Sequence, residues 1–345
     1  MIDDLLRATV RDLADESGTP HGLAARALAD GQRIRRNRRT AAVSTALAAV
    51  LAVTIPFVTL LGRSDESRPL PAATVTVAPA PAFKPTEVFT GPGGVLLLGI
   101  QERTRSFALY PETGQYRQFP DGIGLVEPSP DGRYAVIWRD DSENIRIFNL
   151  RTGEYWQPPI PAASYTSWSA DGSRLLVSHV KGYSIVDPAR RRSTDHKVDF
   201  GQMPCLEYCQ FTWFDGDTRV ALPQAWTRGE EETRLTGIAI FEASSGKVSE
   251  HLPIKAMPIG EHSTSPDGRL MLVRQTRSPE QLTVVDIVTR QETAHFSASW
   301  SRFLADGSIL AQNGGVLTRY AGNGTVLEKM ELPLELTGRN LTFGF

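Results

Sequence analysis

At 345 residues, the chain is long enough for two or three domains of ordinary size, or for one large repeat domain with an appendage. A hydrophobic content of 41% with a net charge of -2 excludes wholesale disorder. The near-neutral balance argues against a nucleic-acid partner, which would normally contact a clearly basic domain. With only two cysteines, the chain is not a small disulfide scaffold.

Residues 1–40 are predicted to form a short helical segment in the cytoplasm. Apolar residues follow roughly one helical stripe from Leu5 to Leu13, and acidic residues lie in the first turn, where the helix dipole favours them. The helical pattern resumes at residues 22–36. Two short helices of this size cannot bury a core of their own. We expect this segment to set membrane topology, or alternatively to dock a cytosolic partner.

Residues 41–62 are predicted to form a transmembrane helix, because no ionisable side chain interrupts them. As an α-helix they would be about 33 Å long, enough to cross a hydrocarbon core of about 30 Å. Arginines without an acid precede the run and both signs follow it, so the positive-inside rule places residues 1–40 in the cytoplasm and residues 63–345 outside. A cleaved signal peptide would need a shorter charged region and a small-residue cleavage site. We therefore expect an uncleaved, single-pass anchor in the cell membrane.

Residues 63–84 are predicted to form a Pro/Ala-rich linker. Four prolines occur in this segment, with Ala, Thr and Val between them. This composition favours an extended, polyproline-like stalk without a regular strand ladder.

A pattern of about 40 residues is repeated six times within residues 85–345. Each copy has a turn with Asp-Gly or Gly-Gly, an apolar segment rich in β-formers, a polar loop, a second strand and a second turn, followed by a third strand. The glycines of the first turns are Gly94, Gly132, Gly172, Gly216, Gly268 and Gly307. Three strands per copy and one before each turn make a four-stranded sheet, the size of a propeller blade. A β-sandwich would not produce this regular period.

The sequence "SPDGR" followed by an apolar strand occurs at residues 129–133 and again at residues 265–269, and Thr-Gly turns follow further along. In these motifs the repeats resemble the WD40-like β-propeller repeats of the TolB type, over roughly residues 86–335. The Trp-Asp and Gly-His dipeptides of true WD40 repeats are missing. The resemblance therefore implies the looser bacterial class, whose members include periplasmic scaffolds and peptidase-associated propellers.

The predicted fold is an all-β, six-bladed β-propeller, preceded by a transmembrane helix and short N-terminal helices. The last residues alternate the apolar side chains of Leu341, Phe343 and Phe345, which predicts a final strand. We expect this strand to complete the first blade beside residues 95–100, closing the ring and removing an exposed sheet edge. A seven-bladed ring with one degenerate blade is the alternative.

The sequence offers little evidence for catalysis. None of the six histidines has an HxxxH, HxH or HExxH spacing, and no G-x-S-x-G nucleophile motif occurs. Acidic residues cluster at residues 139–144 and 228–233, where solvated loops are the default and calcium is the alternative. We predict no catalytic residues, no metal ligands and no cofactor.

Two cysteines are candidates for a disulfide bond, and two other residues are candidates for ligand contact. Cys205 and Cys209 would meet oxidising conditions outside the cell, and we expect a disulfide that closes a small loop. The bridge requires a turn, because an extended chain would hold these residues about 13 Å apart. Trp226 lies in the longest repeat, where a protruding loop can bind a ligand, and His262 lies just before an Asp-Gly turn and could face the central channel. We expect the tryptophans mostly to pack between blades; they are Trp138, Trp156, Trp168, Trp213, Trp226 and Trp300.

These observations predict a non-catalytic, membrane-anchored, extracytoplasmic β-propeller that binds a protein, peptide or glycan. One alternative is an extracytoplasmic hydrolase or lyase whose site is assembled in the channel from separate blades. The other is an anti-sigma-like transmembrane regulator. The predicted partners are the membrane, through a single span, and a protein or peptide outside the cell.

Overall fold

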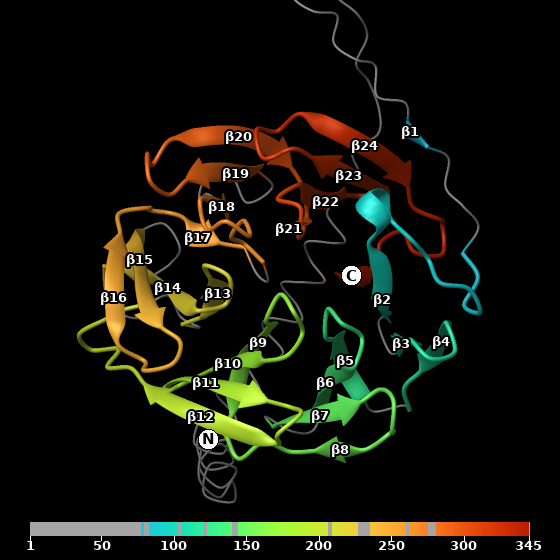
Figure 1. Cartoon of the computed structure of the whole chain (residues 1–345), viewed down its shortest axis with the longest axis horizontal. Helices are drawn as coiled ribbons and strands as arrows, with labels where there is room; N and C mark the ends of the chain where they lie inside the picture. Colours follow the sequence, from blue (N-terminus) through green and yellow to red (C-terminus); the bar gives the residue numbers. More distant parts are fainter. Residues whose placement is uncertain are drawn as a thin grey trace, which may run out of the picture. The chain divides into compact units, whose positions relative to one another are not determined.

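The computed structural model describes residues 77–78, 83–102, 105–120, 123–139, 144–205, 209–226, 235–259, 262–274 and 281–344. They form an all-β propeller in which six sheets surround a central axis (Figure 1). The prediction of six blades is confirmed, and the seven-bladed alternative is wrong.

Each blade is an antiparallel sheet of four strands that follow one another from the axis outwards. Blade 1 contains β25 (Asn340–Gly344), β2 (Leu96–Gln101), β3 (Ser106–Tyr110) and β4 (Gln115–Gln118), and the short 3-10 helix η2 (Pro92–Gly94) precedes β2. Blade 2 contains β5 (Ile123–Pro128), β6 (Tyr134–Arg139), β7 (Ile145–Asn149) and β8 (Tyr155–Trp156). Blade 3 contains β9 (Ala163–Trp168), β10 (Leu175–His179), β11 (Gly182–Asp187) and β12 (Arg192–Lys197).

The other three blades follow the same order. Blade 4 contains β13 (Thr212–Phe214), β14 (Arg219–Ala225), β15 (Leu235–Glu242) and β16 (Val248–Leu252). Blade 5 contains β17 (Met257–Pro258), β18 (Leu270–Arg274), β19 (Gln281–Asp286) and β20 (Glu292–Ser297). Blade 6 contains β21 (Trp300–Phe303), β22 (Ile309–Asn313), β23 (Val316–Tyr320) and β24 (Val326–Glu331).

The core consists of apolar clusters between neighbouring blades. The second strands are buried on both faces, and all five residues of β10 are buried. Such strands are continuous apolar runs in the sequence because neither face meets water. Successive strands in a blade are antiparallel, so their connections alternate between two faces of the ring. We call the face with the inner-to-second and third-to-outer strand connections the turn face, and the opposite one the connection face.

The ring is closed by its C-terminal strand. β25 pairs antiparallel with β2, with Phe343 opposite Leu97 and Leu341 opposite Ile100, so the expected closure is confirmed. A second contact lies at the rim, where β1 (Val77–Ala78) pairs parallel with β24 as a fifth strand of blade 6. The linker was expected to form no strand ladder, and this expectation is wrong at these two residues because the outer edge of β24 supplies the pairing partner.

Two of the Asp-Gly turns interlock with the turn of the preceding blade. Gly268 adopts φ +70°, and a Cβ added there would lie 2.5 Å from Oδ1 of Asp215 in the preceding blade. Gly172 repeats the arrangement, since a Cβ there would lie 2.6 Å from Cγ of Asp131. These turns therefore need glycine both for the positive φ and for the close approach of the neighbouring carboxylate.

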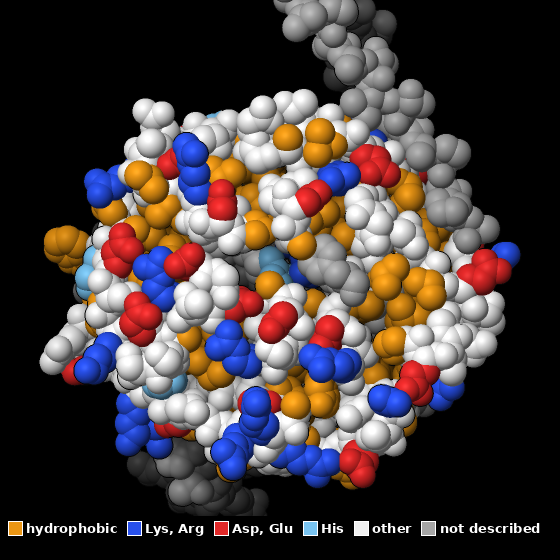
Figure 2. All heavy atoms as spheres, viewed as in Figure 1, with side chains coloured by type: hydrophobic (Ala, Val, Ile, Leu, Met, Phe, Trp, Pro, Cys, Tyr) orange, Lys and Arg blue, Asp and Glu red, His pale blue; other side chains and the backbone are white. Residues whose placement is uncertain are grey.

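Charged side chains on the turns largely pair with one another. Asp215 contacts Arg219 at 2.7 Å and Asp286 contacts Arg269 at 2.8 Å, while Asp306 pairs with Arg319. On the face shown in Figure 2, acidic and basic side chains are interspersed.

Several predictions from the sequence fall outside the described residues. They are the helical segment at 1–40, the transmembrane helix at 41–62 and all of the linker except residues 77–78 and 83–84. In the part of the chain that the structure describes, no helix has the length and apolarity needed to span a bilayer.

Candidate functional site

Trp226 is the largest exposed apolar side chain among the described residues of the connection face. It follows β14 directly and is 71% exposed. The backbone behind it is fixed, because the N–H of Ala225 donates to the carbonyl oxygen of Pro204 at 2.9 Å and Cys205 forms a β-bridge with Gln224. The indole is therefore presented by a rigid strand end.

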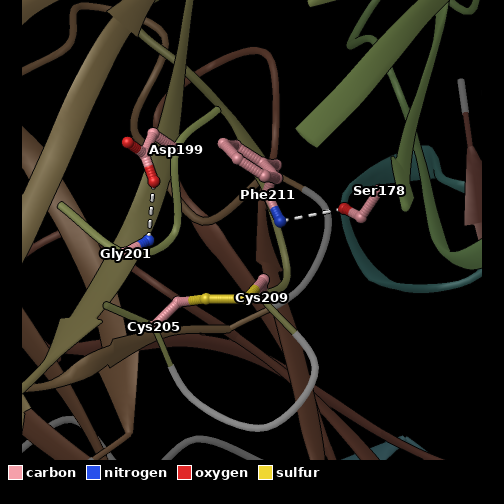
Figure 3. The surroundings of a disulfide bond; sticks show 6 residues. All are labelled: Ser178, Asp199, Gly201, Cys205, Cys209 and Phe211. Atoms are coloured by element: carbon pink, nitrogen blue, oxygen red, sulfur yellow. Dashed lines mark hydrogen bonds between the residues drawn. A yellow bond between two sulfur atoms is a disulfide. The ribbon is translucent and has the colours of Figure 1, made fainter. Parts of the chain in front are cut away.

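The segment that backs Trp226 is closed by a disulfide between Cys205 and Cys209 (Figure 3). Their Cα atoms are 5.1 Å apart, and the predicted bridge is present. Both sulfurs belong to buried residues in an aromatic cluster between blades 3 and 4, which includes Tyr183 and Phe211. The N–H of Phe211 donates to Ser178 Oγ at 2.9 Å and ties the end of the segment to blade 3 (Figure 3).

Two further apolar side chains are exposed on the connection face. Val180, in the tight β10–β11 turn of blade 3, is 67% exposed, and Leu334, between β24 and β25, is 89% exposed. Val180 belongs to the blade next to Trp226. Exposed apolar side chains therefore lie on two neighbouring blades of this face.

His262 lies at an irregular point of the inner strand of blade 5. Ile259 and Ser263 both hydrogen-bond to Leu272, so the regular pairing with β18 is interrupted before His262. His262 has a positive φ of 54°, and its carbonyl oxygen accepts the N–H of Phe303 in blade 6 at 3.0 Å. Burial and the nearby Arg302 hold the pKa of His262 well below 6.5, so the ring is neutral at pH 7. The structure thus places His262 at the junction of blades 5 and 6, apart from Trp226.

A histidine network in blade 3 was not singled out from the sequence. Nε2 of His179 lies 2.9 Å from Asp195 Oδ1, and the Ser184 hydroxyl donates to the same oxygen at 2.9 Å. The Lys181 N–H donates to Nδ1 at 3.2 Å, so Nε2 carries the proton and donates to Asp195. Asp195 is far from His179 in the sequence, and only the pairing of β10 and β12 with β11 brings them together.

A small cavity of about 260 Å³ lies on the turn face between blades 1 and 2. Arg117 stacks on the Tyr110 ring at one side, and Arg151 pairs with Glu112 at 2.7 Å at the other. The Arg151 and Glu112 charges at this cavity therefore compensate each other.

The described ranges contain no group of three or more His, Cys, Asp or Glu side chains that could hold a metal ion. Of the two acidic loops, only Arg139 and Asn144 at the ends of residues 139–144 are described, and residues 228–233 lie outside.

Comparisons with known proteins give no family for this chain. No family model matches it, and the search of curated proteins gave no match. Among solved structures, a chain of the Kuenenia stuttgartiensis hydrazine synthase is 14% identical, with a TM-score of 0.41; the match covers 62% of this chain and 66% of that one. A chain of a mitotic checkpoint complex is 12% identical, with a TM-score of 0.45, over 81% of this chain and 89% of that one.

Proposed function

We propose that this chain is a non-catalytic, membrane-anchored β-propeller whose connection face binds a protein or peptide outside the cell. The observation that carries the proposal is the exposed Trp226 indole on a backbone fixed by the Cys205–Cys209 segment. Tryptophan is enriched among the residues that dominate binding energies, and a rigid aromatic anchor loses little conformational entropy on binding.

Two features support the proposed location. The disulfide is typical of an oxidising compartment. The apolar run at residues 41–62, preceded by arginines, favours a single span with the propeller on the outer side.

The binding surface can be tested by photo-crosslinking in intact cells. A photoreactive amino acid replaces Trp226 in one full-length variant and Val288 in another. Val288 is the matched control, because it is 78% exposed but lies between β19 and β20 on the turn face. We expect a discrete crosslinked product at position 226 and none at 288. Equal labelling at both positions, or no product at 226, would contradict the proposal.

Membrane topology needs a separate experiment. A Val288→Cys variant should react with a membrane-impermeant maleimide in intact cells, whereas Thr19→Cys should react only after permeabilisation. The native cysteines are joined in a disulfide and should not contribute. The reverse pattern would place the propeller inside the cell.

A further inference from the structure

Three junctions between inner strands are bridged by a long side chain, which donates a hydrogen bond to a backbone carbonyl oxygen of the neighbouring inner strand. The pairs are Trp168 Nε1 with Glu127 O at 3.0 Å, Trp213 Nε1 with Ser167 O at 2.9 Å, and Arg302 Nη1 with Phe343 O. These bonds join blades 2 and 3, blades 3 and 4, and blades 6 and 1.

Blade 5 departs from this arrangement. Trp168 directly precedes the serine of the Ser-Ala-Asp-Gly turn and pairs with Leu175. Thr264 directly precedes the serine of the equivalent Ser-Pro-Asp-Gly turn and pairs with Met271. Blade 5 therefore has a small hydroxyl side chain where blade 3 has an indole that reaches the preceding blade.

The polar atoms around this position have no hydrogen-bond partner among the described residues. They are Oγ1 of Thr212, Nε2 of His262, Oγ of Ser263, Oγ1 of Thr264 and Oγ of Ser301. All five atoms are hidden from solvent. Buried polar atoms in folded proteins almost always have a partner, which is often an ordered water molecule.

Strand register shows which junction each hydroxyl faces, because directly paired residues point to the same side of a sheet. Thr212 pairs with Ala221 and Thr264 with Met271, and both apolar partners lie in the cluster between blades 4 and 5. The first pair of hydroxyls therefore faces one junction from its two sides.

The second pair is arranged in the same way. Ser301 pairs with Ala311 and Ser263 lies opposite Leu272, and both apolar partners belong to the cluster between blades 5 and 6. His262 precedes Ser263 and has a strained positive φ, which marks the same place as irregular.

We propose that the inner end of blade 5 binds ordered water on both sides, between Thr212 and Thr264 at one junction and between Ser263 and Ser301 at the other. The water replaces the indole–carbonyl bond of blades 3 and 4 and satisfies the buried hydroxyls. Each pair consists of hydroxyl groups, which can both donate to and accept from a water molecule. Each junction of blade 5 then includes a bridging water, beside the direct bond from the Phe303 N–H to the His262 carbonyl oxygen.

A double-mutant cycle in the full chain tests the first pair through Thr212→Val, Thr264→Val and the combined variant. Valine keeps the shape and removes the hydroxyl. If water bridges the pair, Thr264→Val lowers the folding equilibrium constant about tenfold, and the same change costs less in the Thr212→Val background. Thr283→Val is the matched reference, since this buried hydroxyl has a protein partner in His295 at 3.2 Å.

The sign of the change in the folding equilibrium constant shows whether water bridges the two hydroxyls or whether they have no partner. A buried hydroxyl with no partner destabilises the folded state, so valine would leave the folding equilibrium constant unchanged or raise it. Either result for Thr264→Val, or strict additivity of the two changes, overturns the proposal. A high-resolution crystal structure of the full chain gives a second readout. We expect a water peak within hydrogen-bonding distance of Oγ1 of both threonines, and its absence overturns the proposal.

Discussion

The carboxylate of Asp217 accepts a hydrogen bond from the backbone N–H of Ala170, at 2.5 Å, across the junction of blades 3 and 4. The guanidinium of Arg174 contacts the carbonyl oxygen of Asp217 at 2.8 Å. Burial disfavours the charged carboxylate and raises the pKa of Asp217 to about 6. One of the bonds between blades is therefore made by a group that titrates near neutral pH.

The stability of the propeller should depend on the charge of Asp217. Its folded-state pKa of about 6 exceeds the ordinary 3.8, so its stabilising contribution is complete below about pH 4 and is lost as the pH rises through 6. We expect Asp217→Asn, which keeps the acceptor and tolerates the positive φ of 63°, to be more stable than the parent at pH 8 by up to about 3 kcal/mol. Urea unfolding at pH 4 and pH 8 measures the difference, which should vanish at pH 4.

Asp267 provides a control because its pKa is shifted in the opposite direction. The Ser265 hydroxyl and the backbone N–H of Arg269 lower the pKa of Asp267, so its contribution is present at neutral pH and is lost as the pH falls. Asp267→Asn should therefore be less stable than the parent at pH 8. A gain at pH 8 for both variants would indicate a general charge effect and contradict the assignment to Asp217.

The interlocked turns predict a difference between two glycines with the same conformation. Gly268 and Gly307 have φ of +70° and +79°, but only a Cβ at Gly268 would meet the Asp215 carboxylate. Gly307→Ala should lower the free energy of unfolding by about 1 kcal/mol through backbone strain. Gly268→Ala should lower it by at least about 1 kcal/mol more, because Asp215 must move. Equal losses for the two variants in chemical denaturation would show that the turns do not interlock.

Much of the fold could be predicted because its determinants are local and repeated. The Asp-Gly turns and apolar runs recur with a regular period, and Leu341 and Phe343 show the alternation of a strand. The pairing of Val77–Ala78 with β24 has no such signal, since two residues among prolines depend on the free edge of a distant strand. The interruption of the inner strand near His262 could not be predicted either, because it depends on Ile259 and Ser263 both hydrogen-bonding to Leu272.

The candidate site was predictable only in part. The spacing of Cys205 and Cys209 indicated a closed loop, and the insertion pointed to Trp226. The backing of Trp226 by this loop depends on the hydrogen bond between Ala225 and Pro204, which no local pattern encodes. The buried role of Asp217 was missed for a similar reason, since its partner Ala170 lies in the turn of another blade.

The His179 network predicts acid sensitivity in blade 3. Burial lowers the pKa of His179 despite the nearby Asp195. The unfolded chain therefore binds more protons than the folded one, and stability falls as the pH drops through about 6.5. His179→Gln keeps a donor for Asp195 but does not titrate, so we expect a smaller loss of unfolding free energy between pH 7.5 and pH 5. Part of the loss should remain in this variant, because burial also lowers the pKa values of His196 and His262. An unchanged pH profile in this variant would rule out His179 as its source.

The disulfide predicts a stability that depends on redox conditions. It closes a loop of about five residues, so its removal should lower the free energy of unfolding by about 2 kcal/mol. The double variant Cys205→Ser/Cys209→Ser should show this loss in thermal and urea unfolding. The chain has only these two cysteines, so a reductant should destabilise the parent and leave the variant unchanged. A reductant effect of equal size in both proteins would refute the prediction. In the variant, crosslinking from position 226 should also weaken, because the backing of the indole loosens.

The closing strand predicts a large effect at Phe343. This side chain is fully buried in the cluster between blades 6 and 1, with its ring 5.9 Å from that of Trp300. Phe343→Ala should lower the free energy of unfolding by about 3–5 kcal/mol. It should also weaken the pairing of β25 with β2, so the β2 amides should exchange hydrogen faster than those of β22, which lies within blade 6. Leu334→Ala, in the connection that leads to β25 and 89% exposed, is the control and should change stability by less than about 0.5 kcal/mol. If Phe343→Ala were as mild as the control, or if exchange rose equally in both strands, the ring would not depend on β25 for its closure.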